Sequence, residues 1–248
     1  MLEKTKGIVL HTIKYSENSL ILIVYTEEYG RQSYMLSGIH SKKAAQPKKL
    51  IHPLNLLSID VYYKSSRELQ KIKEYKSLSP LSGIHSSIIK TTICLFMAEI
   101  LYRTIKEEEK NENLFSFLIN SIQILDLADK GVENFHLVFL LQLSKFLGFF
   151  PNDNYDSYFS RFNIQTGSFS PFLEGDKNLV GNKESQLVQK ILTMNYSNLD
   201  ELEISGATRT VILDKLILYF QAHSEGLSQL KSHKILQEVF SGNSNALD

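Results

Sequence analysis

The sequence predicts an α+β protein in which a small five-stranded β-barrel precedes a mostly α-helical domain. Apolar residues recur with a period of two in short segments before residue 80, and with a period of three to four after residue 86. Ser-Pro and Ser-Gly pairs at 79–83 separate the two patterns. The composition changes at the same place, because residues 1–80 contain 7 of the 12 tyrosines and none of the 14 phenylalanines. We therefore expect one domain over residues 1–80 and a second over 81–248.

The expected strands are short and rich in β-branched and aromatic residues. Residues 18–27 are apolar on both faces, as expected of a barrel strand that also packs against another layer. Gly30 can adopt a positive φ, so Glu28-Tyr29-Gly30 is expected to form a hairpin turn. Five such strands in the first 80 residues suit a Greek-key barrel of the oligonucleotide- and oligosaccharide-binding (OB) type. The expected strands cover residues 5–14, 18–27, 31–38, 54–64 and 68–76.

Helical stripes of apolar residues follow the barrel. The first expected helix covers residues 86–106, with Ser86 or Ser87 as its N-cap, and Asn113 is expected to cap the second. Residues 135–151 are apolar nearly all round, which predicts a buried central helix. The remaining helices are expected at 184–194, 207–222 and 228–240.

Residues 152–183 lose the helical pattern and contain turn-forming residues throughout. We expect a loop-rich lobe in which FNIQTGSF forms a small hairpin. This lobe contains no cysteine. The single cysteine of the chain, Cys94, lies in the apolar run TTICLFMAEI, so it is expected to be a buried, inert thiol in a reducing compartment.

The charge is unevenly distributed although it sums to zero. Residues 1–80 hold 13 basic and 7 acidic residues, whereas the rest of the chain holds 14 and 20. The segment GIHSKKAAQPKKLIHP, residues 38–53, carries four lysines and no carboxylate. Lysines neutralise phosphates, and OB barrels add aromatic side chains on which bases stack. The candidate DNA-binding residues are therefore Arg31, Tyr34, Lys42, Lys43, Lys48, Lys49 and Tyr62.

Several classes of function lack support in the sequence. It has no glycine-rich phosphate loop and no nucleophile elbow, and its seven histidines lack metal-ligand spacing. No enzymatic activity, cofactor or metal is therefore expected. The N-terminus lacks a signal peptide, and no apolar run approaches the ~18 residues of a membrane helix, so we expect a cytoplasmic protein. The alternative to nucleic-acid binding is a non-enzymatic adaptor whose barrel and acidic helical domain bind other proteins.

The order and spacing of several segments resemble the bacterial recombination mediator family RecO. They are KGIVLHTIKYSENSLILIVYTEEYGRQSYMLSG, LIHPLNLL, AEILYRTIKEEEKNENLF, FHLVFLLQLSKFLGFFP, and Arg209 with LKSHKIL. The resemblance implies an N-terminal OB domain, a helical C-terminal domain and no enzymatic turnover. It also implies binding of single- and double-stranded DNA, annealing of complementary strands, and a RecF-type repair pathway at the nucleoid. There, together with RecR, such proteins help RecA replace single-strand binding protein (SSB).

Two features of this sequence differ from the family pattern. Many members carry a four-cysteine zinc lobe after the Gly-Phe-x-Pro step, whereas Tyr155 and Tyr158 stand here at the position of the first cysteine pair. A metal-free lobe held by Tyr and Phe packing is therefore expected. The resemblance also implies that the helical domain docks the acidic SSB tail, which needs a basic rim, whereas Glu133 and Asn134 stand here ahead of the central helix in place of arginines. The nearest candidate contacts for this tail are Arg103, His136 and Lys145.

Overall fold

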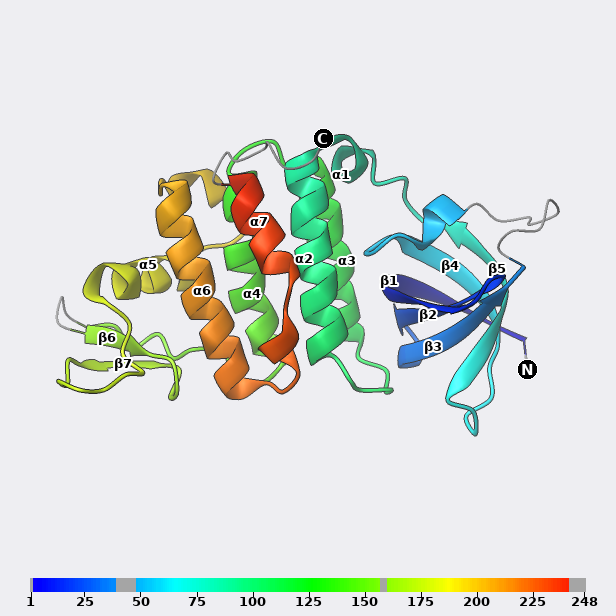
Figure 1. Ribbon diagram of the computed structural model, residues 1–248, viewed down its shortest axis with the longest axis horizontal. Coiled ribbons are helices and arrows are strands. Elements are labelled where there is room, and N and C mark those ends of the chain that lie inside the picture. Colours follow the sequence, from blue (N-terminus) through cyan, green and yellow to red (C-terminus); the bar gives the residue numbers. More distant parts are fainter. Residues whose placement is uncertain (1, 39–47, 157–159, 241–248) are drawn as a thin grey trace. The chain divides into compact units, whose positions relative to one another are not determined.

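A computed structural model describes residues 2–38, 48–156 and 160–240, with only the backbone of Lys48 and Lys49. The chain divides into two compact units, Met1–Asp126 and Leu127–Asp248. Figure 1 labels the α-helices and strands of both. The first unit contains the barrel together with the helices that directly follow it, whereas the sequence predicts a domain boundary at residue 80.

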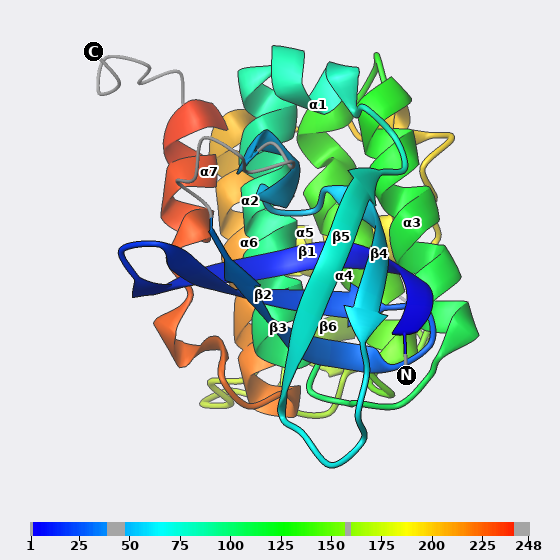
Figure 2. The ribbon, with the colours of Figure 1, turned by 90° about the vertical axis from the view of Figure 1, so that its right-hand side faces the viewer.

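The first unit begins with a closed five-stranded barrel, which confirms the predicted architecture (Figure 2). The strand order is β1-β2-β3-β5-β4, and every neighbouring pair is antiparallel except β3 with β5. This order is that of an OB-type Greek-key barrel. The strands are β1 (Leu2–Ser16), β2 (Ser19–Thr26), β3 (Gly30–Ser37), β4 (Leu56–Tyr62) and β5 (Leu69–Ser77).

The predicted turn between β2 and β3 is confirmed. Gly30 has a φ of 57°, in the region that favours glycine. The Thr26 hydroxyl donates to the Gly30 carbonyl at 2.9 Å and accepts from the Tyr29 amide at 3.0 Å. The Thr26 side chain therefore stabilises the turn, in addition to the pairing of β2 with β3.

Both faces of β2 are buried, as its sequence predicts. Leu22 and Val24 point into the barrel core, whereas Ile23 and Tyr25 occupy the outer face and are 5% and 1% exposed. The Tyr25 ring lies 6.2 Å from that of Phe115, which belongs to a helix of the same unit. The outer face of the barrel is therefore partly covered by helices.

Three α-helices and one 3₁₀ helix, η1, complete the first unit. Ser87 caps the long helix, since its side chain accepts from the Lys90 amide, which confirms one of the two predicted caps. The prediction of Asn113 as the next cap is wrong. That helix begins one residue earlier than Asn113, and the Asn111 side chain accepts from the Leu114 amide at 3.0 Å. The elements are η1 (Lys48–Ile51), α1 (Ser82–Ser86), α2 (Ile88–Thr104) and α3 (Glu112–Leu127).

Cys94 lies on α2 and is buried, as predicted. Its thiol donates to the Pro53 carbonyl at 3.4 Å. Burial raises the pKa of this thiol to about 12, so it is protonated at neutral pH.

The second unit is built around a buried helix, α4 (Phe135–Phe146), which confirms the predicted central helix. Leu137, Phe139 and Leu141 have no exposed surface. Helices α5 and α6 pack against α4, and α7 packs against α6. The surrounding elements are η2 (Val132–Asn134), α5 (Asn182–Leu192), η3 (Leu199–Glu201), α6 (Gly206–His223), η4 (Leu227–Gln229) and α7 (Ser232–Phe240).

The irregular lobe contains the predicted hairpin, formed by β6 (Ser160–Asn163) and β7 (Ser168–Pro171). The Asn154 side chain donates to the Phe169 carbonyl and accepts from the Phe169 amide, at 2.9 and 2.8 Å. The Phe169 ring contacts those of Tyr155 and Phe162, with centroids 5.3 and 5.4 Å apart. Tyr158 lies outside the described residues.

The residues that the structure describes contain neither a metal-binding cluster nor a membrane-spanning helix. Within 2–38, 48–156 and 160–240, no three His, Cys, Asp or Glu side chains gather where they could hold a metal ion. Over the same stretches, no helix combines the length and apolar character that crossing a membrane requires.

Candidate nucleic-acid interface

Arg31, a predicted phosphate contact, is occupied within the protein. One guanidinium nitrogen, Nη1, donates to the carbonyls of Tyr102 and Ile105 at 2.7 and 2.6 Å. The guanidinium carbon also lies 4.8 Å from the centroid of the Tyr102 ring. Both carbonyls belong to the C-terminal end of α2, where a cation is favoured by the helix dipole. Arg31 therefore caps the C-terminal end of α2, and its contact with DNA stays a prediction.

Tyr34, unlike Arg31, is excluded as a DNA contact, because its ring is not accessible for stacking on a base. It has no exposed surface and lies in the barrel core beside Leu22 and Ile59. Burial raises the pKa of its hydroxyl. A base cannot reach this ring without opening the barrel, so the prediction for Tyr34 is wrong.

The four lysines of the opening loop remain a prediction. Lys42 and Lys43 lie outside the described residues. The backbone of Lys48 and Lys49 belongs to η1, but their side chains are not described.

Tyr62 is open to solvent, and strand pairing places it in a continuous row of outward side chains. It is 45% exposed at the end of β4. Directly paired residues of neighbouring strands point to the same face of a sheet. The pairs Tyr62–Lys71, Lys71–Met35, Met35–Ile21 and Ile21–Ile13 join five strands. We call these five side chains, Tyr62, Lys71, Met35, Ile21 and Ile13, the outer row.

The outer row combines an aromatic ring, a cation and apolar surface. Lys71 is exposed, and Ile13 is 40% exposed. Tyr15, near the end of β1, is 64% exposed and adds a second ring at that end of the strand. A cation next to exposed rings is the arrangement by which OB barrels hold phosphates and stack bases.

A second basic group lies on the loop between β4 and β5, residues 63–68. Gln70 is 1% exposed, and its side chain donates to the carbonyls of Lys64 and Arg67 at 2.8 and 2.7 Å. It also accepts from the Lys64 amide at 3.0 Å. At the start of the loop, the Tyr63 ring stacks on that of Tyr29 at 3.9 Å. The loop backbone is thereby fixed, with Lys64 and Arg67 exposed.

OB barrels bind nucleic acid with the face of their second and third strands and with the loops after the first and fourth. The outer row crosses that face, and Lys64 and Arg67 lie on the loop after β4. Lys64, Arg67 and Lys71 are not among the DNA-binding residues that the sequence predicts. The signal for Lys71 was present, since pairing the fourth and fifth strands places it beside Tyr62.

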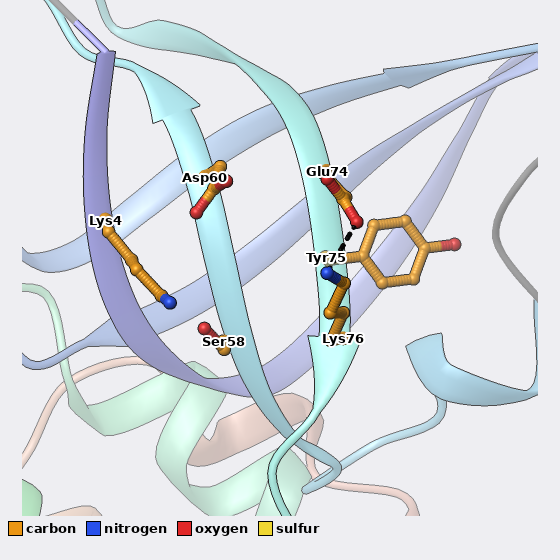
Figure 3. A pocket seen from close by; sticks show the side chains of 6 residues that line it. All are labelled: Lys4, Ser58, Asp60, Glu74, Tyr75 and Lys76. Atoms are coloured by element: carbon orange, nitrogen blue, oxygen red, sulfur yellow. Dashed lines mark ion pairs between the residues drawn. The ribbon is translucent and has the colours of Figure 1, made fainter.

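A pocket elsewhere on the barrel has balanced charge and serves as a contrast (Figure 3). Lys4 on β1 is paired with Asp60 on β4, and Asp60 with Glu74 on β5. Lys76 forms an ion pair with Glu74 at 3.0 Å, and this hydrogen bond raises the pKa of the lysine. Two carboxylates accompany two ammonium groups here, so this pocket offers little net attraction for a phosphate. Its lining residues are Lys4, Ser58, Asp60, Glu74, Tyr75 and Lys76.

The three candidate contacts for the SSB tail have different surroundings. Arg103 forms an ion pair with Glu99 at 2.7 Å within α2. Lys145 on α4 is exposed, with its ammonium 4.5 Å from the centroid of the Phe150 ring. His136 has no exposed surface, and burial lowers its pKa to about 3. His136 is therefore a neutral core residue, and the prediction that it contacts a tail is wrong.

Comparison with known proteins covers nearly the whole chain. Residues 1–81 match the family model "Recombination protein O N terminal", and residues 85–234 match "Recombination protein O C terminal". The chain is 38% identical to the DNA repair protein RecO of Azobacteroides pseudotrichonymphae, over 97% of this chain and 100% of that protein. It is 38% identical to the DNA repair protein RecO of Bacteroides fragilis, over the same shares. That of Flavobacterium psychrophilum is 38% identical over 96% and 99%. The N-terminal model covers the OB-type barrel, and the C-terminal model covers most of the helices that follow it. The chain therefore belongs to the RecO family of DNA repair proteins.

Proposed function

We propose that this protein is a non-enzymatic mediator of recombinational repair that binds single- and double-stranded DNA and anneals complementary strands. Family membership supports this proposal. The observation that carries it is the outer row, in which Tyr62 pairs with Lys71 next to the fixed basic loop of Lys64 and Arg67. The ring supplies a stacking surface, and the cations supply sequence-independent attraction to phosphates.

The proposal extends to partners by family resemblance. We propose that the protein acts with RecR on SSB-coated DNA at the nucleoid, in the cytoplasm, and helps RecA to load. Lys145 is the candidate contact for the acidic SSB tail that is both exposed and on the central helix of the second unit. Titrating a labelled SSB tail peptide against Lys145→Glu tests this contact. Reversing the charge should weaken an acidic peptide, and unchanged affinity would place the tail elsewhere.

The salt dependence of DNA binding tests the basic part of the interface. Anisotropy of a labelled single strand would be measured at several salt concentrations for the wild type and a Lys64→Gln/Arg67→Gln/Lys71→Gln variant. Each lost phosphate contact reduces the log–log salt slope by roughly 0.7 for single strands, so the slope should shrink by up to about 2. Lys4→Gln/Lys76→Gln is the matched control, because these lysines lie with two carboxylates on the same barrel. Its slope should stay close to that of the wild type.

Two further variants separate the ring from the opening loop. Tyr62→Leu should weaken single-strand binding and leave the salt slope unchanged, because stacking releases no counterions. A Lys42/Lys43/Lys48/Lys49→Ala variant tests whether the opening loop adds phosphate contacts. If the wild type binds no DNA at low salt, the proposal fails. The protein-binding adaptor then becomes the better interpretation.

A further inference from the structure

The first unit has a second pocket with a volume of about 410 Å³, and none of its lining residues belongs to the outer row. Three short segments line it: η1 with the residues that follow it, the end of β5 with its connection to α1, and α1 itself. Its volume lies within the ~300–1,000 Å³ typical of small-molecule sites. The lining residues are Leu50, His52, Asn55, Ser77, Ser79, Pro80 and His85.

The lining suits a flat, uncharged ring with polar edges. Leu50 and Pro80 provide apolar contact, while His52 and His85 are exposed and offer planar rings with hydrogen-bonding nitrogens. The Ser77 hydroxyl donates to the Ser79 carbonyl at 2.8 Å, which holds the connection in shape. A few polar groups on an otherwise apolar wall is the usual composition of a pocket that orients a small ring.

The charge of the lining and its position in the sequence narrow the class of ligand further. None of the lining residues is a carboxylate. The two residues directly before Leu50 are Lys48 and Lys49, so the chain that forms one wall is preceded by cations. Cations suit the phosphates that flank a base in a strand, and unpaired bases can turn out of the stack into such pockets.

We propose that this pocket receives one unpaired base of a single strand, and we call it the base pocket. The proposal rests on the DNA-binding function proposed above. Ser77 of the base pocket and Lys71 of the outer row are six residues apart on β5, or about 20 Å along the strand. An OB barrel engages ~4–16 nucleotides, so one strand can reach both. Because a paired base cannot enter, the base pocket favours single strands over duplexes.

Filling the base pocket tests its role. Ser79→Phe places a ring in it, and Ser58→Phe is the matched control, since Ser58 lines the charge-balanced pocket of the same barrel. Affinities for a single strand and for the matching duplex would be measured at one salt concentration. A lost base contact should weaken single-strand binding roughly five- to a hundredfold. Duplex binding by Ser79→Phe, and both affinities of the control, should stay within about twofold.

Four further measurements keep the test independent of folding. His52→Ala/His85→Ala removes two exposed rings without adding bulk, and thermal melting shows whether Ser79→Phe is folded. A strand in which abasic sites replace the bases should bind the wild type more weakly than the intact strand does. No variant of the base pocket should weaken the binding of this abasic strand further. A strand carrying 2-aminopurine should show a fluorescence change with the wild type that the His52→Ala/His85→Ala variant lacks.

The outcomes separate the two proposals. If the wild type binds no DNA, both fail. If the wild type binds DNA but Ser79→Phe and His52→Ala/His85→Ala bind single strands as tightly as it does, the base pocket alone is refuted. Equal weakening of single-strand and duplex binding would also refute it, because the affected group would then contact the backbone rather than a base.

Discussion

Arg31 shows how one side chain joins two layers of the first unit. It leaves the barrel at the start of β3 and satisfies two carbonyls at the end of α2, Tyr102 and Ile105. The backbone follows the same path, since the Arg31 amide donates to the Glu107 carbonyl at 2.9 Å. Hydrogen bonds from charged donors contribute more than neutral ones.

Removing this cation should destabilise the protein. Arg31→Ala is expected to lower the free energy of unfolding by about 2–3 kcal/mol, because two helix-end carbonyls lose a charged donor. Arg31→Lys should lose less, since an ammonium can still reach one carbonyl. Urea denaturation measures both, and Arg67→Ala is the control, as an exposed arginine whose replacement should cost within about 0.5 kcal/mol. Normal stability combined with lost DNA affinity would show that Arg31 contacts phosphate and adds little to the stability of α2.

His136 makes stability depend on pH. Burial, reinforced by the positive charge of Arg209, lowers its pKa from 6.5 to about 3 in the folded state. Between these values the unfolded chain binds a proton that the folded chain does not. The free energy of unfolding therefore falls as pH drops from about 6.5 towards about 3, by up to about 1.4 kcal/mol per pH unit. This contribution is fully present above pH 6.5.

Replacing His136 tests that dependence. Urea denaturation between pH 7.5 and 4.5 should show a shallower loss of stability with acid for His136→Gln than for the wild type. The exposed His85→Gln is the comparison, and it should leave the wild-type pH dependence in place. Parallel curves for the wild type and His136→Gln would contradict a buried neutral imidazole.

One buried side-chain amide organises the loop between β4 and β5. Gln70 makes three hydrogen bonds to the backbone of Lys64 and Arg67. Gln70→Ala should cost about 1–3 kcal/mol of stability, because those groups lose their partner. Trypsin should then cleave after Lys64 or Arg67 faster than in the wild type. Asn18→Ala, on the loop between β1 and β2, provides a matched change of an exposed residue. An unchanged cleavage rate would show that the loop is held by its strands alone.

An asparagine side chain and a cluster of aromatic rings hold the lobe that follows α4. Asn154 bonds both backbone groups of Phe169, and Phe162 packs against Phe169 and Tyr219. We expect Asn154→Ala to cost about 1–2 kcal/mol and the exposed Asn152→Ala much less. Prolonged incubation of the wild type with a zinc chelator should leave the melting temperature unchanged. A lower melting temperature after chelation would show that a metal stabilises the lobe.

Local sequence pattern and long-range contacts determine different features of this fold. The strands and the central helix follow from periodicity, which local sequence carries, and the predicted barrel and buried α4 match the structure. The burial of Tyr34 does not follow from periodicity, because it depends on closure of the barrel. The partners of Arg31 do not follow from it either, because they lie on α2, about seventy residues further along the chain. The outer row likewise requires the register of five strands at once. A single sequence does not determine these long-range pairings.

The boundary between the units is also a property of packing. The family models meet between residues 81 and 85, whereas the compact units divide after Asp126. Tyr25 and Ile23 on the outer face of β2 explain why a cut near residue 81 should be unfavourable. Tyr25 packs against Phe115 of α3, and α2 contacts β1. A barrel without these helices would expose large apolar side chains on its outer surface.

A fragment of residues 1–127, which ends with α3, should therefore fold cooperatively, and a fragment of residues 1–81 should not. The shorter fragment loses the cover of Tyr25 and the carbonyls that bind Arg31, so it should bind an apolar dye and aggregate. Circular dichroism melting and dye fluorescence compare the two. If exposed apolar surface is the cause, Ile23→Thr/Tyr25→Thr in the shorter fragment should improve its solubility. A soluble fragment of residues 1–81 that melts as sharply as residues 1–127 would show that the barrel is an independent domain, as the sequence predicts.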